Sequence, residues 1–333
     1  MILQQIDEKI INLALEAETV LKEQFNKVDE ICMYNSERIL SEFIKNNVSY
    51  SDFTDVNGYG NFDPGRDKLE KMFASVLGTE DALVRTQIMS GTNAIYLALS
   101  SLLKYGDTLL SITGTPYDSL LELIGLAGSS SQSLMANGVK FEQIDLVNND
   151  FDKEAIINRL SKHDVKAIEI QRSRGYSSRS SLAIDKIDEI IKLIRSVNTE
   201  VIIIVDNCYG ELVEKREPGH VGADIVIGSL MKNLGGGVAS TGGYIAGRKD
   251  LIEMVADRLT SPGIGKDLGA NFNQNINFFK GLFMAPNAVK GALKTAIFAS
   301  FMLEKLGFDE VTPKYNEYRT DIIQTVVLNS KQN

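Results

Sequence analysis

Between about residues 82 and 247, short apolar segments alternate with amphipathic ones, and this pattern limits the chain to a small set of folds. Apolar residues recur at helical spacing in segments such as 152–161 and 184–197, which separate several expected strands. The expected strands are ALVRTQ, DTLLSI, VKFEQIDL, VKAIEIQ, VIIIVDN, DIVIGS and GGYIAG. Strands joined through helices form a mostly parallel sheet with helices on both faces. The pattern therefore predicts an α/β domain of three layers, which binds ligands outside the carboxyl ends of its strands.

Two further parts are expected on either side of this domain. Apolar residues at helical spacing predict a helical N-terminal segment over residues 1–50. The large domain is expected over residues 51–285, and it opens with a Gly- and Asn-rich loop that contains Tyr59. Residues 286–333 are expected to form a helical linker and the start of an incomplete C-terminal small domain, with a last helix in KYNEYRTDIIQTVVL.

Composition argues against several classes of partner. The 333 residues carry a formal net charge of −9 and no dense Lys/Arg cluster, so a nucleic-acid partner is not expected. No apolar run approaches the roughly 20 residues that cross a bilayer, and the N-terminus lacks the apolar core of a signal peptide. We therefore expect a cytoplasmic protein without a membrane partner. Cys32, Cys208, His163 and His220 show no metal-ligand spacing, so no metal is expected.

A lysine and an aspartate follow two of the expected strands. Lys232 comes after the apolar segment DIVIG and a polar turn, and three glycines begin shortly after it. An ammonium group near apolar packing is partly desolvated, so we expect a lowered pKa and a nucleophilic amine at Lys232. Asp206 follows the apolar segment VIIIV. Because the ends of parallel strands share one edge of a sheet, we expect Asp206 and Lys232 to face one crevice.

Other strand ends add the remaining parts of a cofactor site. Ser90, Gly91 and Thr92 begin an expected helix, and the N–H groups at a helix start suit a phosphate. Tyr117 follows another strand, where it is placed to stack on a flat ring. A plain helix cap and ordinary core packing are the open alternatives for these residues. Together with a lysine for an imine and a carboxylate for a pyridine nitrogen, they predict binding of pyridoxal 5′-phosphate.

Several motifs, in one order along the chain, resemble those of a known family. The run from VDNCYGELVE to GGYIAG is similar to the cysteine/methionine-metabolism group of pyridoxal-phosphate enzymes, which have the aspartate-aminotransferase fold (fold type I). The bacterial aluminium-resistance or methionine-gamma-lyase-like proteins are more similar still. The segments that carry this resemblance are GYGNFDPGRDKLE, ALVRTQIMSGTNAI, ITGTPYDSLLELIG, IQRSRGYSSR, VDNCYGELVE and RLTSPGIGKDLGA. It implies a carbon–sulfur lyase that performs β- or γ-elimination on a sulfur amino acid such as methionine, cystathionine or cysteine.

The resemblance also implies a role for each residue of the site. Lys232 is then the Schiff-base lysine and the general base, and Asp206 is the partner of the pyridinium nitrogen. Tyr117 stacks on the ring and acts as an acid or base. The residues implied at the phosphate are Gly91, Thr92 and Ser229.

The resemblance implies further contacts from residues outside this group. Tyr59 is expected to reach the phosphate of a neighbouring subunit, in a homodimer or homotetramer. This sequence has Asn61 where the wider group's loop has an arginine. Arg172 and Arg174 are expected to contact the cofactor's phenolic oxygen or the substrate carboxylate, and structural ion pairs are the open alternative for both.

Other functions are compatible with the same motifs. An aminotransferase or a racemase shares the fold and the first chemical steps. The chain ends at VVLNSKQN, before the small domain in which relatives carry a substrate-binding arginine, so a shortened, catalytically impaired homologue or a non-catalytic scaffold is another alternative. A nicotinamide-binding Rossmann domain is disfavoured, because the glycines at 235–237 do not form the G-x-G-x-x-G pattern.

Overall fold

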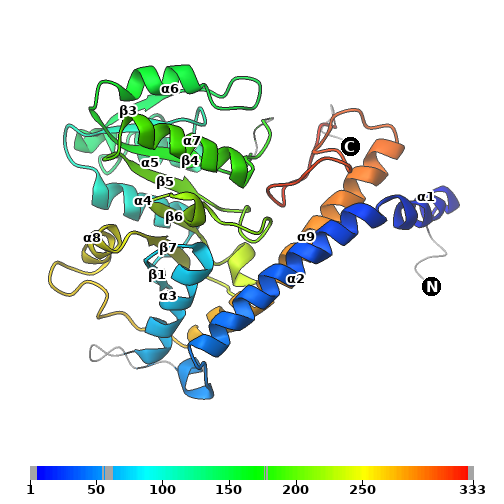
Figure 1. Ribbon diagram of the computed structural model, residues 1–333, viewed down its shortest axis with the longest axis horizontal. Helices are drawn as coiled ribbons and strands as arrows, with labels where there is room; N and C mark the ends of the chain where they lie inside the picture. The colour runs from blue at the N-terminus through cyan, green and yellow to red at the C-terminus, as the bar shows by residue number, and fades with distance from the viewer. Residues whose placement is uncertain (1–5, 55, 57–62, 176, 178, 329–333) are drawn as a thin grey trace.

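The computed structural model describes residues 6–54, 56, 63–175, 177 and 179–328, and its centre is a seven-stranded sheet (Figure 1). β7 pairs antiparallel with both β1 and β6, and the remaining pairs are parallel. The predicted mostly parallel α/β sheet is confirmed. In spatial order the strands are β1 (Asp81–Arg85), β7 (Gly243–Gly247), β6 (Ile225–Ser229), β5 (Ile202–Asp206), β4 (Val165–Gln171), β2 (Thr108–Ser111) and β3 (Lys140–Gln143).

Helices cover both faces of this sheet, as its continuous apolar strands require. Alternate side chains of β5 enter two separate cores: Ile203 and Val205 pack on one face, and Ile202 and Ile204 on the other. The first face is covered by α3 (Pro64–Leu77), α6 (Lys153–Leu160) and α7 (Ile184–Val197). The second is covered by α4 (Gly91–Leu102), α5 (Asp118–Ile124) and α8 (Lys249–Leu259). Short 3₁₀ turns are η2 (Tyr50–Phe53), η3 (Met135–Asn137), η4 (Pro218–Val221) and η5 (Asn233–Gly235).

The ends of α3 show why the helices begin and stop where the sequence predicted. The carboxylate of Asp63 accepts a hydrogen bond from the backbone N–H of Arg66 (3.0 Å), and Pro64 is the first helical residue. Gly78 ends the helix in the left-handed conformation, with φ of 73°. The predicted helix start near Pro64 is therefore confirmed.

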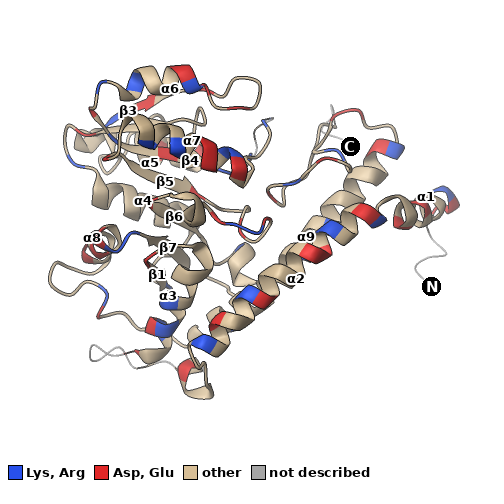
Figure 2. Cartoon of the chain, in the orientation of Figure 1, with Lys and Arg blue, Asp and Glu red and all other residues tan. Residues whose placement is uncertain are grey.

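Beyond the sheet, three helices form an elongated arm (Figure 1). α1 (Glu8–Val20) leads into α2 (Lys22–Lys45), which lies along α9 (Asn275–Lys305). Phe43 of α2 packs edge-on against Phe279 of α9, with ring centroids 6.0 Å apart. Acidic and basic residues are interspersed along α2 (Figure 2). No helix in the described part of the chain combines the length and apolar character of a membrane span.

The C-terminal region departs from the sequence-based expectation in two ways. α9 starts at Asn275, well before the predicted start near residue 288, and the expected boundary at residues 285 and 286 lies inside it. The predicted helix in KYNEYRTDIIQTVVL is wrong: this segment is irregular and ends in β9 (Thr325–Val326), which pairs with β8 (Val311–Thr312). Tertiary contacts override helix propensity here, because Asp321 accepts hydrogen bonds from Ser173 Oγ (2.8 Å) and from the N–H of Arg174 (3.2 Å).

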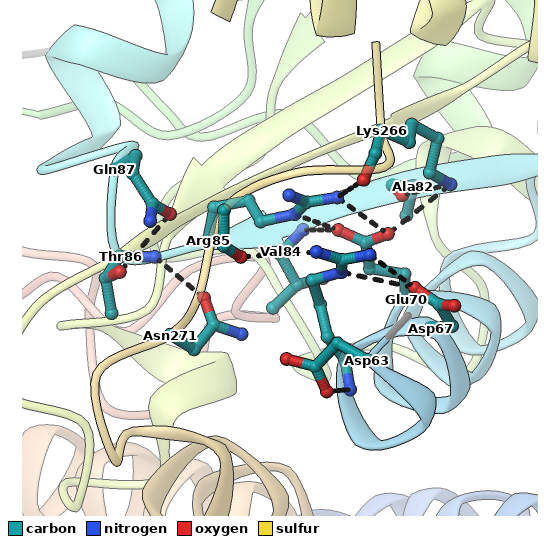
Figure 3. A network of polar contacts seen from close by, with 12 residues as sticks. Asp63, Asp67, Glu70, Ala82, Val84, Arg85, Thr86, Gln87, Lys266 and Asn271 are labelled. Carbon is teal, nitrogen blue, oxygen red and sulfur yellow. Dashed lines mark hydrogen bonds and ion pairs between the residues drawn. The ribbon is translucent and has the colours of Figure 1, made fainter. Parts of the chain in front are cut away.

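A buried polar network ties β1 to the loop between α8 and α9 (Figure 3). Arg85 Nε donates to Glu70 Oε1 (2.5 Å), and both side chains are almost completely buried. The same guanidinium donates to the carbonyl oxygens of Leu268 (2.8 Å) and Lys266 (2.9 Å). Burial alone raises the pKa of Glu70, but Arg85 and Lys266 outweigh it and hold the pKa below its usual value. The network therefore fixes the loop to the edge of the sheet.

Candidate active site

The carboxyl ends of the parallel strands open into a pocket of about 390 Å³. Lys232 and Asp206 both line it, so the structure brings together the two residues expected to share a crevice. Tyr59 lies outside the described residues. The predicted site residues found in the wall are Ser90, Gly91, Thr92, Tyr117, Asp206, Ser229 and Lys232.

The N-terminus of α4 forms one wall of the pocket. Ser90 Oγ accepts a hydrogen bond from the N–H of Asn93 (3.1 Å), so its side chain caps the helix. A Cβ on Gly91 would lie 3.1 Å from Cys208 Sγ and 3.4 Å from Ser229 Cβ, so glycine lets the helix begin against the strand ends. The first N–H groups of a helix have no acceptor within it. This wall can therefore bind an anion.

Asp206 lies at the end of β5, on the floor of the pocket. Its side chain is 5% exposed, and Oδ1 accepts a hydrogen bond from the N–H of Cys208 (3.1 Å). Burial raises the pKa of this carboxyl above its usual value. A cationic ring nitrogen beside it would favour the ionised form.

Lys232 follows β6 after a tight turn, in which its backbone N–H donates to the carbonyl oxygen of Ser229 (3.3 Å). Its Nζ lies 3.6 Å from the centroid of the Tyr209 ring. Burial alone lowers the pKa of Lys232, but the acidic groups of Cys208, Tyr209 and Asp206 outweigh it, and the pKa is raised. The lowered pKa predicted from the sequence is therefore wrong, because these side chains surround the amine.

Tyr117 is the residue before α5 and lines the pocket. Burial, and next the carboxylate of Asp206, raise the pKa of Tyr117 far above its usual value. The phenol therefore keeps its proton and is suited to donate it. Thr92 Oγ1 and Ser119 Oγ lie 3.2 Å apart beside it, which links the starts of α4 and α5.

The two predicted substrate-binding arginines lie outside this pocket. Arg172 is fully buried: Nη1 donates to Asn207 Oδ1 (2.7 Å) and to the Gly210 carbonyl (2.9 Å), while Nη2 pairs with Glu214 (2.7 Å). Its placement therefore matches the alternative of a structural ion pair. Arg174 lines a neighbouring pocket of about 440 Å³ that shares Tyr117, and its backbone N–H is bound to Asp321.

Several residues that line the pocket were not predicted from the sequence. Gln171, at the end of β4, lines the pocket, and its backbone N–H donates to Thr113 Oγ1 (3.1 Å). Cys208 and Tyr209, two and three residues after Asp206, also line the pocket. Their position shortly after the strand-end carboxylate of Asp206 was the sequence feature that could have identified them as pocket residues.

The residues present fit pyridoxal phosphate. The pocket offers the primary amine of Lys232, the buried carboxyl of Asp206 and the aromatic ring of Tyr117 in its wall. The capped start of α4 adds free N–H groups and hydroxyls for a phosphate. Each part of the cofactor therefore has a matching group in the wall.

A mostly parallel sheet with this pocket at its carboxyl edge defines a fold type I protein of the pyridoxal-phosphate class. A family model described as methionine gamma-lyase matches residues 10–333, and the chain belongs to this family. The resemblance to the aluminium-resistance group that the motifs suggested is confirmed by the relatives below.

Similar proteins come from several bacteria. Uncharacterized protein YnbB of Bacillus subtilis (strain 168) is 43% identical over 327 residues, which cover 98% of this chain and 77% of that protein. A Clostridium acetobutylicum structure named as involved in aluminum resistance is 44% identical, with a TM-score of 0.96, and the match covers 98% of this chain and 79% of that one. A carbon-sulfur lyase involved in aluminum resistance from Clostridium novyi NT is 41% identical, with a TM-score of 0.94, and the match covers 98% and 78% of the two chains.

A more distant structure shares the fold alone. The pyridoxal-5′-phosphate dependent protein YhfS from Escherichia coli is 20% identical, with a TM-score of 0.60, and the match covers 86% of this chain and 72% of that one.

Proposed function

We propose that the protein is a pyridoxal-phosphate-dependent carbon–sulfur lyase that acts on a sulfur amino acid by β- or γ-elimination. The observation that carries the proposal is the shared pocket of Lys232 and Asp206 at the start of α4. The family description and the name of the Clostridium novyi relative support the reaction class.

Each part of the cofactor is assigned to a group in the wall. Lys232 would bind its aldehyde carbon, Asp206 would pair with its ring nitrogen, and Tyr117 would stack on the ring. Gly91 and Thr92 at the start of α4, with the hydroxyl of Ser229, would hold the phosphate. When bound, pyridoxal phosphate supplies an electron sink for the charge left when a bond to the substrate α-carbon breaks.

Two side chains then move protons. Lys232 Nζ would take the proton from the substrate α-carbon as general base. Tyr117 keeps its proton at Oη, because burial and Asp206 raise its pKa, and donates it to the departing sulfur. The raised pKa favours an acid role for Tyr117 over a base role.

The substrate is a small amino acid, and a second copy of the chain is the expected partner. Phe283, Met284 and Val238 expose 51%, 45% and 38% of their surface around one apolar groove. Burial of such side chains favours a homodimer or homotetramer. Light scattering of the purified protein tests this, and a monomer at all concentrations would contradict it.

The test of function uses Lys232→Ala, with the exposed Lys249→Ala as its control. Wild type and the control should show the visible absorbance of lysine-bound pyridoxal phosphate, and Lys232→Ala should not. Wild type should release ammonia and a keto acid from methionine, cystathionine or cysteine. Amino-group transfer without ammonia would indicate an aminotransferase instead. If Lys232→Ala kept both the absorbance and the turnover, the proposal would be wrong.

A further inference from the structure

The turn that follows β5 has an unusual backbone. Tyr209 has a φ of 70° and Leu212 a φ of 60°, both in the left-handed region. This conformation is unfavourable for residues with large side chains, and it persists only where neighbouring groups impose it. The left-handed backbone of this turn is explained by the groups that the turn contacts.

Arg172 stabilises this backbone conformation through hydrogen bonds to the turn. Its guanidinium donates to Asn207 Oδ1 (2.7 Å) and to the Gly210 carbonyl (2.9 Å), which brackets Tyr209 on both sides. A Cβ on Gly210 would lie 2.7 Å from the Arg172 side chain, so the turn and the arginine fit only with glycine there. The Arg172 network therefore serves the turn rather than the substrate.

Two further contacts fix the same turn. Glu217 accepts hydrogen bonds from Asn207 Nδ2 (2.9 Å) and from the N–H of Leu212 (2.8 Å). The C-terminal segment adds a third support, because the N–H of Ile322 donates to the Tyr209 carbonyl (3.2 Å). The backbone of Tyr209 is thus fixed by groups from three separate parts of the chain.

The result is that the Tyr209 ring lies against the Lys232 amine, 3.6 Å from Nζ to the ring centroid. A cation is attracted to the face of an aromatic ring at this distance. The other titratable groups near the amine are Asp206 and Cys208 from the end of β5, with Tyr117 across the same pocket.

We propose that Tyr209 is a positioning residue, whose ring face holds the Lys232 amine in the pocket. Its importance for catalysis rests on the function proposed above, whereas its contact with the amine does not. The strained turn and its three supports are explained by the need to place this ring. Removal of the ring should therefore free the amine and make its protonated form less stable.

The test measures the pKa of Lys232 in cofactor-free protein. Acetic anhydride labels neutral amines, and mass spectrometry of the peptide containing Lys232 gives its labelling rate at each pH. Tyr209→Gly removes the ring and suits the left-handed backbone, so the protein should remain folded. The pKa of Lys232 should fall by about 0.5 to 1 unit in this variant and by clearly less in Tyr209→Phe, which keeps the ring and loses only the hydroxyl. Lys249, labelled in the same samples, should not change.

An unchanged Lys232 pKa in Tyr209→Gly would overturn the proposal. An equal fall in Tyr209→Phe and Tyr209→Gly would overturn it too, because the hydroxyl rather than the ring face would then be responsible. Because the measurement needs neither cofactor nor substrate, its failure is separate from any failure of the lyase assay. A protein with the expected pKa shift and no lyase activity would retain the Tyr209 contact and lose only the proposed function.

Discussion

Glu169 gives the sharpest prediction, because its carboxyl is buried beside that of Asp206. Ser111 Oγ donates to the Gly114 carbonyl oxygen (2.9 Å) and to Glu169 Oε2 (3.0 Å). A hydroxyl has one proton, so Glu169 receives only a shared hydrogen bond. This bond does not offset the burial of a charge, so the folded protein favours the protonated carboxyl. Its other oxygen, Oε1, has no hydrogen-bond partner in the described parts of the chain.

The stability of the protein should therefore depend on Glu169 in a defined pH window. Burial, and next Asp206, raise the pKa of Glu169 from 4.5 to about 7. Between these values the unfolded chain loses the proton while the folded protein keeps it, so stability falls as the pH rises and the loss is complete above the folded pKa. Glu169→Gln cannot titrate and should avoid this loss. Relative to wild type, it should gain about 2 to 3 kcal/mol between about pH 5 and about pH 8.

Urea denaturation of the cofactor-free proteins, followed by circular dichroism at both pH values, measures this gain. The exposed Glu154→Gln on α6 is the matched control and should show no such pH-dependent difference. An equal effect of Glu169→Gln at both pH values would mean that burial and Asp206 do not raise the pKa of Glu169, and the reasoning would fail.

Two further variants test other parts of the structure. Arg85→Met leaves the buried Glu70 with only the more distant Lys266 as an ion-pair partner, so it should lower the free energy of unfolding by about 3 kcal/mol. Arg85→Met combined with Glu70→Leu should recover most of this loss. Urea denaturation measures both variants, and a larger loss in the double variant would refute the reasoning. Ser90→Ala removes the cap of α4 and should lower stability by about 1 kcal/mol in thermal unfolding, together with weaker binding of pyridoxal phosphate in an absorbance titration. Unchanged cofactor affinity in Ser90→Ala would remove α4 from the proposed phosphate site.

Most of the fold could be predicted because its strands are continuous apolar runs. The segment around Ile202–Asp206 is buried on both faces, and such runs identify central parallel strands from sequence alone. The failures occur where tertiary contacts decide. The boundary expected between residues 285 and 286 lies inside α9, which begins at Asn275 and continues through Pro286. The segment around Asp321 has helical periodicity, yet its polar side chains are bound to the end of β4.

The site could be predicted only as far as strand ends locate it. Lys232 and Asp206 were found because the ends of parallel strands converge at one edge. A strand-end arginine looks the same in sequence whether it faces the pocket or the core, so the burial of Arg172 could not be foreseen. The left-handed backbone of Tyr209 was equally hidden, because such a conformation is predicted from glycine or asparagine and not from tyrosine.

Two buried carboxyl groups, those of Asp206 and Glu169, lie on one face of neighbouring strands near the pocket. Asp206 pairs in register with Gln171, and Glu169 lies two residues earlier on the same strand as Gln171. Burial disfavours two negative charges so close together, so one of the groups must keep its proton. Asp206 accepts a hydrogen bond from a backbone N–H and interacts with the nearby Lys232 ammonium, whereas Glu169 accepts one from a hydroxyl that Ser111 also donates to the Gly114 carbonyl. The negative charge therefore belongs to Asp206, and a cationic ring nitrogen bound there would meet one carboxylate rather than two.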